Sequence, residues 1–251
     1  MFLPCNFAWE RVSLRHKILI FITMKPKLHA LFLLLTSLFW CAGIASAQQE
    51  HEYVDLGLPS GTLWATCNIG ADNPWQPGDY FAWGETDSKP KYDWSFYQYA
   101  DGNYDKLIKY CNKSSYGNDG YTDRLKVLED ADDAANAIWG PEWHIPTADQ
   151  FKELMDNCTN EWTVSYKDKG VAGRIFKSKK NDNEIFLPAA GFNGNDGNPT
   201  HVGNYGFYWS STLCTDNPSN APLLYFHSGF INPFSNSFRY YGQSVRPVKH
   251  R

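Results

Sequence analysis

The sequence predicts an α+β fold made of short strands, two helices and long structured loops. Its apolar stretches are short, and each is closed by Gly, Asn, Asp or Pro, which favour turns. Two segments carry helix start signals instead. After position 47 the sequence shows no internal repeat, low-complexity tail or linker, so we expect one domain over residues 48–251.

Three strands are predicted near the start of this domain. Residues 53–58 partly alternate and end at Pro59-Ser60-Gly61, which indicates a strand followed by a turn. Residues 63–67 and 80–84 are short apolar runs of the same kind.

Two helices are predicted in the middle of the chain. Residues 130–138 begin with several carboxylates, which the dipole of a helix favours in its first turn. The second helix starts after Thr147, which with Gln150 has the spacing of a capping box. Apolar residues then recur at helical spacing as far as residue 157.

The pattern of strands returns in the last third of the chain. The predicted strands are short and bounded by turn residues; they are 175–176, 185–187, 208–211, 224–227 and 244–248.

Residues 24–47 have the organisation of a secretory signal peptide. Lys25 and Lys27 form a basic start, residues 31–38 are apolar, and Ala45-Ser46-Ala47 offers the small residues of a cleavage site. We therefore expect an upstream extension and signal peptide over residues 1–47, with the mature chain starting near Gln48. The mature protein is expected to be periplasmic, at the cell surface or extracellular. Membrane attachment through Cys41 is disfavoured, because bulky Phe39-Trp40 precedes this cysteine.

The charge balance argues against binding to nucleic acid. The whole chain carries a formal net charge of −4, and residues 1–47 are basic, so the mature part is more acidic still. An acidic domain does not attract a phosphate backbone or an anionic lipid surface. We expect a protein or glycan ligand instead, and the oligomeric state is open.

Four cysteines remain after cleavage, namely Cys67, Cys111, Cys158 and Cys214. An oxidising compartment permits two disulfides among them, and a Cys111–Cys158 bridge is our candidate. The alternative is that they are free, small apolar residues.

Other candidate chemistry is sparse, and we expect neither a cofactor nor an enzyme. Asp130, Asp132 and Asp133 form the densest carboxylate group and are a weak Ca²⁺ candidate, although a solvated acidic helix start is favoured. His144, between Trp143 and Ile145, is expected to be a packed core histidine. Ser210-Ser211 lacks the flanking glycines of a nucleophile elbow.

Motifs across the mature chain resemble the Fibrobacter succinogenes major paralogous domain family. They occur in order at residues 57–65 (GLPSGTLWA), 68–71 (NIGA), 81–86 (FAWGET), 143–147 (WHIPT), 186–191 (FLPAAG), 206–212 (GFYWSST) and 242–248 (GQSVRPV). His144 stands where the family usually has Arg. The resemblance implies a C-type-lectin-like fold. Enzymes of related folds, the formylglycine-generating enzymes, need a cysteine pair near the C-terminal end, where Cys214 stands alone.

The C-terminal stretch, residues 207–248, resembles the variable proteins of diversity-generating retroelements in Bacteroidetes. There, adenine-directed reverse transcription replaces Asn codons, and an AAC codon cannot become one for Lys, Glu, Gln, Met or Trp. Residues 213–241 contain none of these five types, although the rest of the chain uses them. The resemblance implies a diversified binding surface, and Cys214 would then be a product of diversification.

The assigned contact residues lie between positions that we attribute to a fixed frame, such as Leu224, Phe226, Arg239 and Gly242. Tyr225 and His227 alternate with Leu224 and Phe226, so they should point outward, beside a loop at 234–238. Rigid aromatic rings mixed with small polar residues are typical of a binding surface. The predicted contact residues are Leu223, Tyr225, His227, Phe230, Asn232, Phe234, Ser235, Asn236, Ser237, Phe238, Tyr240 and Tyr241.

Two interpretations therefore compete. The first is an exported receptor or adhesin with a diversified surface. The second is a cell-surface module of the same family that binds a glycan or protein with a fixed specificity. The aromatic residues could also simply pack a core.

Overall fold

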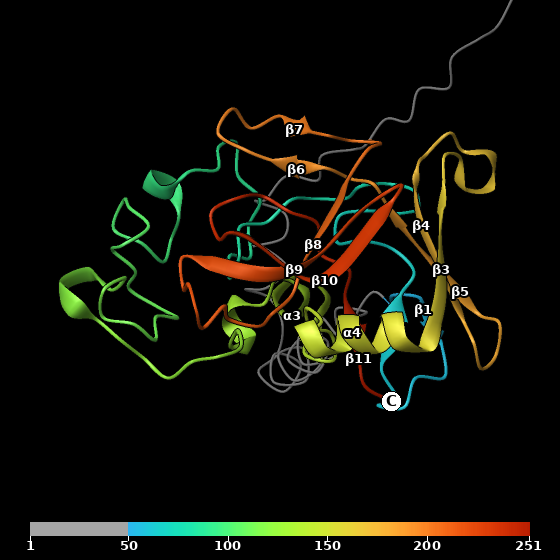
Figure 1. Ribbon diagram of the computed structural model, residues 1–251, viewed down its shortest axis with the longest axis horizontal. Helices are drawn as coiled ribbons and strands as arrows, with labels where there is room; N and C mark the ends of the chain where they lie inside the picture. Colours follow the sequence, from blue (N-terminus) through green and yellow to red (C-terminus); the bar gives the residue numbers. More distant parts are fainter. Residues whose placement is uncertain (1–49) are drawn as a thin grey trace, which may run out of the picture. The chain divides into compact units, whose positions relative to one another are not determined.

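The computed structural model describes residues 50–251, which form an α+β fold of two α-helices and small antiparallel sheets (Figure 1). The predicted fold class is confirmed. The predicted upstream extension and signal peptide, residues 1–47, lie outside the described residues. Within residues 50–251, no helix has the length and apolar character needed to cross a membrane.

A three-stranded sheet at the centre of the described chain is formed by β8 (Gly206–Trp209), β9 (Asn220–His227) and β10 (Phe230–Phe238). The strands lie in the order β10-β9-β8, so β10 is an edge strand. Ser228 and Gly229 form the tight turn between β9 and β10. This hairpin is the structural frame of the predicted binding region.

At Leu223 and Leu224 the central sheet is covered on both faces, because neighbouring side chains of a strand point to opposite sides, whereas Tyr225 and His227 further along β9 are half-buried. Leu223 belongs to a core cluster with Trp83, Trp209 and Val245. Leu224, the next residue, belongs to a second cluster on the other side of β9, with Phe226. Burying both faces of β9 fixes its register, since a slip of one residue would exchange the two sets.

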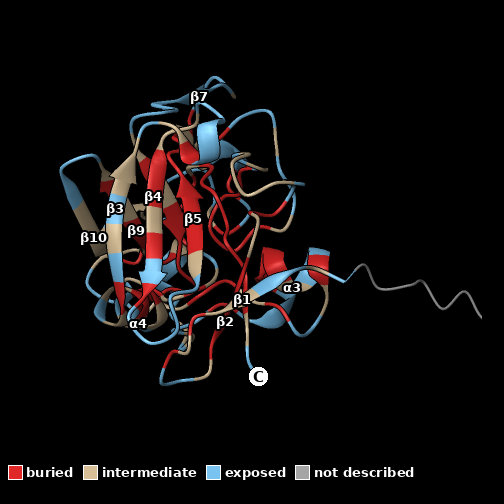
Figure 2. Ribbon diagram, turned by 90° about the vertical axis from the view of Figure 1, so that its right-hand side faces the viewer, coloured by how far each residue is buried: buried red, intermediate tan, exposed pale blue. Residues whose placement is uncertain are grey.

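Three further sheets surround the central one. β3 (Cys158–Thr163), β4 (Gly173–Ser178) and β5 (Glu184–Pro188) form one, with β4 in the middle. In Figure 2, β5 is mostly buried, whereas β3 is largely half-buried or exposed. The other two are β1 (Tyr53–Asp55), β2 (Leu63–Ala65) and β11 (Val248–Lys249), and the pair β6 (Phe192–Asn193) and β7 (Pro199–Thr200).

The second predicted helix is confirmed as α4 (Ala148–Asn157). The Thr147 hydroxyl accepts a hydrogen bond from the Gln150 amide, and the Gln150 side chain accepts one from the Thr147 amide. This reciprocal capping box satisfies two amides that the helix leaves without a partner. Phe151 and Leu154 then bury their side chains in the second core cluster.

The first predicted helix is broken in two. A 3₁₀ turn, η3 (Asp130–Asp132), precedes α3 (Ala134–Trp139). Asp133 separates them, because its extended backbone and its side chain form the N-cap of α3. The remaining 3₁₀ turns are η1 (Trp94–Phe96), η2 (Asn118–Gly120) and η4 (Tyr166–Asp168).

Several strand predictions were wrong in extent. Residues 80–84 do not form a strand. They make only an isolated β-bridge, between Phe81 and Gln243, although all five residues are buried. Residues 244–247 are not part of a strand, and only Val248 and Lys249 form β11. The predicted loop at 234–238 is the second half of β10. β3 was not predicted, because its polar sequence lacks an apolar alternation.

Candidate binding surface

The register of the β9–β10 hairpin places four predicted contact residues on one face. Tyr225 lies opposite Asn232, and His227 lies opposite Phe230. Directly opposed residues of antiparallel strands project to the same side. Leu224 and Phe226 point to the other side and are fully buried, as predicted.

This face continues onto β8 and the segment before it. Phe207 lies opposite Tyr225 on the neighbouring strand, with ring centroids 5.1 Å apart. The Tyr205 ring stacks on Tyr225 at 5.9 Å and meets His227 edge to face at 5.7 Å. His227 in turn stacks on Phe230 at 5.8 Å. Residues on three chain segments therefore form one continuous aromatic layer.

A second group of rings joins this layer through Phe192 on β6. The Phe192 ring lies 5.3 Å from Phe207 and 5.0 Å from Tyr241. Tyr241 contacts Tyr240 at 4.3 Å, and Tyr240 stacks on Phe238 at 5.8 Å. The set therefore reaches from the tip of the hairpin, at Phe230, to the residues that follow β10.

Two further residues complete the set. Trp94, at the start of η1, meets Tyr240 at 5.1 Å and Phe238 at 6.1 Å. His201 stacks on Phe192 at 5.8 Å and meets Tyr205 at 5.1 Å. We call the connected set the aromatic face; its members are Trp94, Phe192, His201, Tyr205, Phe207, Tyr225, His227, Phe230, Phe238, Tyr240 and Tyr241.

The aromatic face carries no Asp, Glu, Lys or Arg among its members. Within residues 50–251, none of the cation–π contacts involves one of its rings. Burial and the Tyr205 hydroxyl raise the pKa of Tyr225, and burial with the Tyr241 hydroxyl raises that of Tyr240. These phenols are therefore neutral at physiological pH, and the polar atoms of the aromatic face are those of phenol, imidazole and indole groups.

The structure removes Leu223 from the predicted contact residues. Its side chain is only 1 % exposed and packs in the first core cluster. Ser235 and Ser237 lie opposite Leu223 and Ala221 and are half-buried. Tyr240 is only 9 % exposed, so its role is to pack against Phe238 and Trp94 rather than to contact a ligand.

Phe234 and Asn236 are exposed, but the structure does not join them to the aromatic face. The register shifts between Asn232 and Ser235, so Phe234 falls within a β-bulge. The Asn232 side chain accepts a hydrogen bond from the Phe234 amide, which ties this asparagine to the bulge. Asn236 lies opposite Pro222 and Phe238 lies opposite Asn220, both on the side of β9 that also carries Leu224. Phe238 joins the aromatic face through its ring contacts with Trp94, Tyr240 and Tyr241 at the end of β10, whereas Asn236 has no such contact.

Sequence reasoning missed Trp94, Phe192, His201 and Tyr205; Phe207 lay within the predicted binding stretch, 207–248, but was not assigned as a contact residue. One local signal was present, since Tyr205 and Phe207 alternate with Gly206 and Tyr208 in the manner of a strand with two faces. Trp94 and Phe192 offered none. They reach the site only because η1 and β6 fold back against the end of β10.

The predicted Cys111–Cys158 disulfide is wrong. Both cysteines are buried and free, as Cys67 and Cys214 are free and half-buried. The Cys111 thiol donates to the Lys113 carbonyl, whereas Cys158 packs in the second core cluster. Burial raises the pKa of both thiols, which keeps them protonated and unreactive.

The carboxylates of the Ca²⁺ candidate do not converge on one point. Asp132 accepts hydrogen bonds from the Tyr99 and Tyr110 hydroxyls and pairs with Lys109 at 2.5 Å. Asp133 turns to the amides of α3 and of Ile145, and Asp130 is exposed. Within residues 50–251, no group of three or more His, Cys, Asp or Glu is arranged to hold a metal ion.

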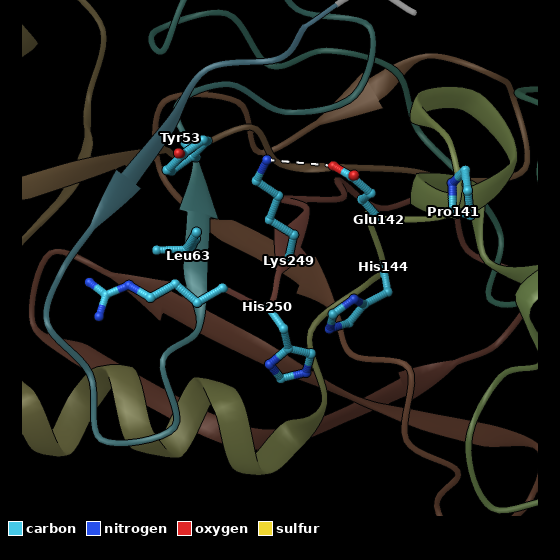
Figure 3. A pocket seen from close by; sticks show the side chains of 8 residues that line it. Tyr53, Leu63, Pro141, Glu142, His144, Lys249 and His250 are labelled. Carbon is cyan, nitrogen blue, oxygen red and sulfur yellow. Dashed lines mark ion pairs between the residues drawn. The ribbon is translucent and has the colours of Figure 1, made fainter.

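His144 is half-buried rather than a fully packed core residue, and it lines a cleft of about 610 Å³. Its ring stacks on His250 at 5.3 Å, and burial, with the nearby His250, lowers the pKa of His144 to about 4. Figure 3 shows the Lys249–Glu142 ion pair across this cleft, with nitrogen and oxygen 3.7 Å apart. The third charged residue of the lining, Arg251, pairs with Asp55.

Comparisons with known proteins leave the function open. Residues 174–248 match the model of a family described as a domain of unknown function (DUF8237). The matched segment runs from Arg174 on β4 to Val248 on β11, so it includes the whole β9–β10 hairpin. A search of curated proteins finds no match, and a search of solved structures finds none either.

Proposed function

We propose that this chain is an exported ligand-binding protein, similar to a receptor or adhesin, which binds its ligand with the aromatic face. The observation that carries the proposal is the connection of eleven aromatic rings, from four separate chain segments, into one layer without Asp, Glu, Lys or Arg. Three of these side chains are exposed, seven are half-buried and Tyr240 is buried. Phe230 is 47 % exposed and Phe238 is 41 % exposed within it. A contiguous exposed apolar patch on a soluble domain usually marks an interaction surface.

The energetic reason is the burial that a ligand would bring. Burying a fully exposed phenylalanine side chain contributes about 1.5–3 kcal/mol, and Phe230 and Phe238 would each gain less than half of this, because they are 47 % and 41 % exposed. The ring contacts already hold the side chains in place, so little rotamer entropy is lost on binding. Tyrosine hydroxyls at positions 205, 225 and 241 can add hydrogen bonds at the same surface.

The proposal includes diversification of the hairpin on a constant frame. The frame positions inferred from the sequence have structural reasons to be constant. Arg239 is fully buried and donates to the Tyr97 hydroxyl and to the carbonyls of Tyr110 and Pro218. Leu224 and Phe226 are equally buried. Substitution at Tyr225, His227 or Phe230 would instead alter the exposed side of the sheet.

A second function rests on four members of the aromatic face. Trp94, Phe192, His201 and Tyr205 precede residue 207, so they lie outside the segment that resembles a diversified region. These four residues favour the alternative of a cell-surface module that binds a glycan or protein with constant specificity. Both functions include a C-type-lectin-like scaffold, which we propose from the sequence resemblance, and export, which we propose from the predicted signal peptide.

Binding is tested by placing the labelled full chain on protein and glycan arrays, beside the double variant Tyr225→Ser/Phe230→Ser. We expect reproducible binding that the double variant loses while its melting temperature is preserved. Binding that is indifferent to both substitutions, or no binding on either array, would overturn the proposed function.

Diversification is tested separately, in the genomic DNA downstream of the gene. We expect a near-identical repeat of the coding segment, differing at adenines, next to a reverse transcriptase gene. If the repeat and the transcriptase are both missing, the fixed-specificity module replaces the diversified receptor.

A further inference from the structure

The geometry of the rings bears on which class of ligand the aromatic face takes. Many of its contacts are edge to face, with interplanar angles of 75° for Phe192–Phe207, 72° for Phe192–Tyr241 and 71° for Trp94–Phe238. Neighbouring rings therefore point in different directions and do not form one flat platform. Rings set at such angles give an uneven surface, and the core of a protein–protein interface packs uneven surfaces together as densely as a protein interior.

The two most exposed phenylalanines of the face are each supported by a stacked ring within the chain. Phe230 stacks on His227 with 24° between the planes, and Phe238 stacks on Tyr240 with 14° between them. Both side chains remain more than 40 % exposed, and a phenyl ring has no hydroxyl with which to bind a sugar. Such supported, protruding rings resemble the anchor residues that fill apolar pockets of a protein partner.

The lack of charge on the face points the same way. Sugar hydroxyls bind best to carboxylates, amides and guanidinium groups, and among the eleven side chains there are only phenol, imidazole and indole donors. The centres of protein–protein interfaces are depleted in charged residues and enriched in aromatic ones. The partner surface that complements this face is therefore uncharged and apolar.

The partner is not expected to add a strand to the sheet. β10 is an edge strand, but it contains Pro233 and a bulge between Asn232 and Ser235. Proline lacks an amide hydrogen and a bulge interrupts the ladder, so both features protect an edge against pairing. We therefore expect the partner to bind the aromatic face and not the edge of β10.

We propose that the ligand is a folded protein with an uncharged apolar surface that receives Phe230 and Phe238. This proposal rests on the proposed function, because it names the partner class for the same surface. Phe234 supplies a matched control. It is 46 % exposed on the same strand, yet none of the aromatic pairs within residues 50–251 includes it.

The test compares Phe230→Ser, Phe238→Ser and Phe234→Ser in the full chain. Proteins that bind the wild type on a protein array are purified and titrated against all four chains. Unfolding of each variant is measured alongside, so that a loss of fold is recognised. We expect Phe230→Ser and Phe238→Ser each to weaken binding about tenfold or more, and Phe234→Ser to change it less than about threefold.

The outcomes separate the partner class from the function. If the wild type binds only on the glycan array, and Phe230→Ser and Phe238→Ser abolish this binding, the proposed function is supported but the proposal of a protein partner is wrong. Concentration-dependent dimerisation of the wild type, lost in both variants, would assign the face to a second copy and also overturn it. Equal effects of all three substitutions on protein binding would contradict the role of the two anchors. Absence of binding on both arrays would overturn the function itself.

Discussion

Arg174 on β4 donates a hydrogen bond from Nη2 to the carbonyl of His227 on β9, over 2.8 Å. The same guanidinium reaches the Phe230 carbonyl at 3.3 Å and donates from Nη1 to the Asn160 side chain at 2.6 Å. Arg174 is buried, so these bonds are shielded from water. One side chain therefore joins the β3-β4-β5 sheet to the turn that presents two rings of the aromatic face.

Arg174→Met should loosen this turn. The carbonyls of the hairpin would lose a charged donor, and such hydrogen bonds contribute about 1.5–3 kcal/mol each. We expect a lower free energy of unfolding in denaturant and faster amide exchange at residues 228–230. The control is Lys177→Met, on the same strand but exposed. Unchanged exchange at the turn in Arg174→Met would show that Arg174 does not hold it.

Leu223→Ala should destabilise the domain as a core substitution. The side chain is 1 % exposed among Trp209, Val245 and their neighbours, and truncating a buried leucine costs about 2–5 kcal/mol. Phe234→Ala, at an exposed position of the same hairpin, should cost well under half as much. Chemical denaturation measures both. If Leu223→Ala changes the free energy of unfolding only slightly, Leu223 is not a core residue and remains a candidate contact residue.

Gly242→Ala should also destabilise the fold, because there is no room for a methyl group. A Cβ at this position would lie 2.7 Å from the Tyr92 ring, and Tyr92 is fully buried with its hydroxyl bonded to the Tyr80 carbonyl. Overpacking of this kind costs about 1–3 kcal/mol. The matched control is Gly194→Ala, whose backbone lies outside the left-handed region and where a Cβ would lie 3.8 Å from its nearest neighbours. If Gly242→Ala has the same denaturant midpoint as the wild type, steric exclusion does not explain a constant glycine at this position.

Asp133 should make stability fall as the pH rises from about 4 to about 6. Burial raises its pKa to about 6, despite the backbone amides of Ala135, Asn136 and Ile145 that donate to it. Between these two pH values the folded state holds a proton that the unfolded state has released. The contribution of Asp133 to the free energy of unfolding is therefore complete below the pKa of the unfolded state, and it is lost as the pH rises through the pKa of the folded state.

The measurement is denaturant unfolding at pH 4 and pH 7 for the wild type, Asp133→Asn and Asp130→Asn. A shift of this size amounts to about 3 kcal/mol. The stability of Asp133→Asn relative to the wild type should therefore improve between pH 4 and pH 7. Asp130→Asn, at an exposed carboxylate, should track the wild type. A constant difference between Asp133→Asn and the wild type would mean that Asp133 is ionised throughout.

The local patterns of the sequence predicted local structure well. The capping box of Thr147 and Gln150 fixed the start of α4, because its bonds join residues three apart. The alternation in β9 predicted which side chains are core, since successive residues of a strand face opposite ways. The β10 segment was missed as a strand because Pro233 and the bulge interrupt its alternation, and its exposed edge carries aromatic residues.

The candidate site was predicted only in part. Tyr225, His227 and Phe230 were assigned from alternation and composition, and the structure places them together. Leu223 has the same parity as Tyr225, so the sequence could not reveal that the first core cluster covers that end of the strand. The Asp130–Asp133 group looked like one cluster, but the break between η3 and α3 turns its members apart.

By itself, the sequence determined the α+β class, the capped helix and the inward and outward sides of the β9 strand. These follow from propensities and hydrogen bonds between residues close together in the chain. Tertiary structure decided the extent of the aromatic face and the burial of Leu223. Trp94 and Tyr240 are far apart in sequence, and their rings meet at 5.1 Å only because η1 packs beside the end of β10. Contacts of this kind depend on how whole elements pack, and no local pattern encodes them.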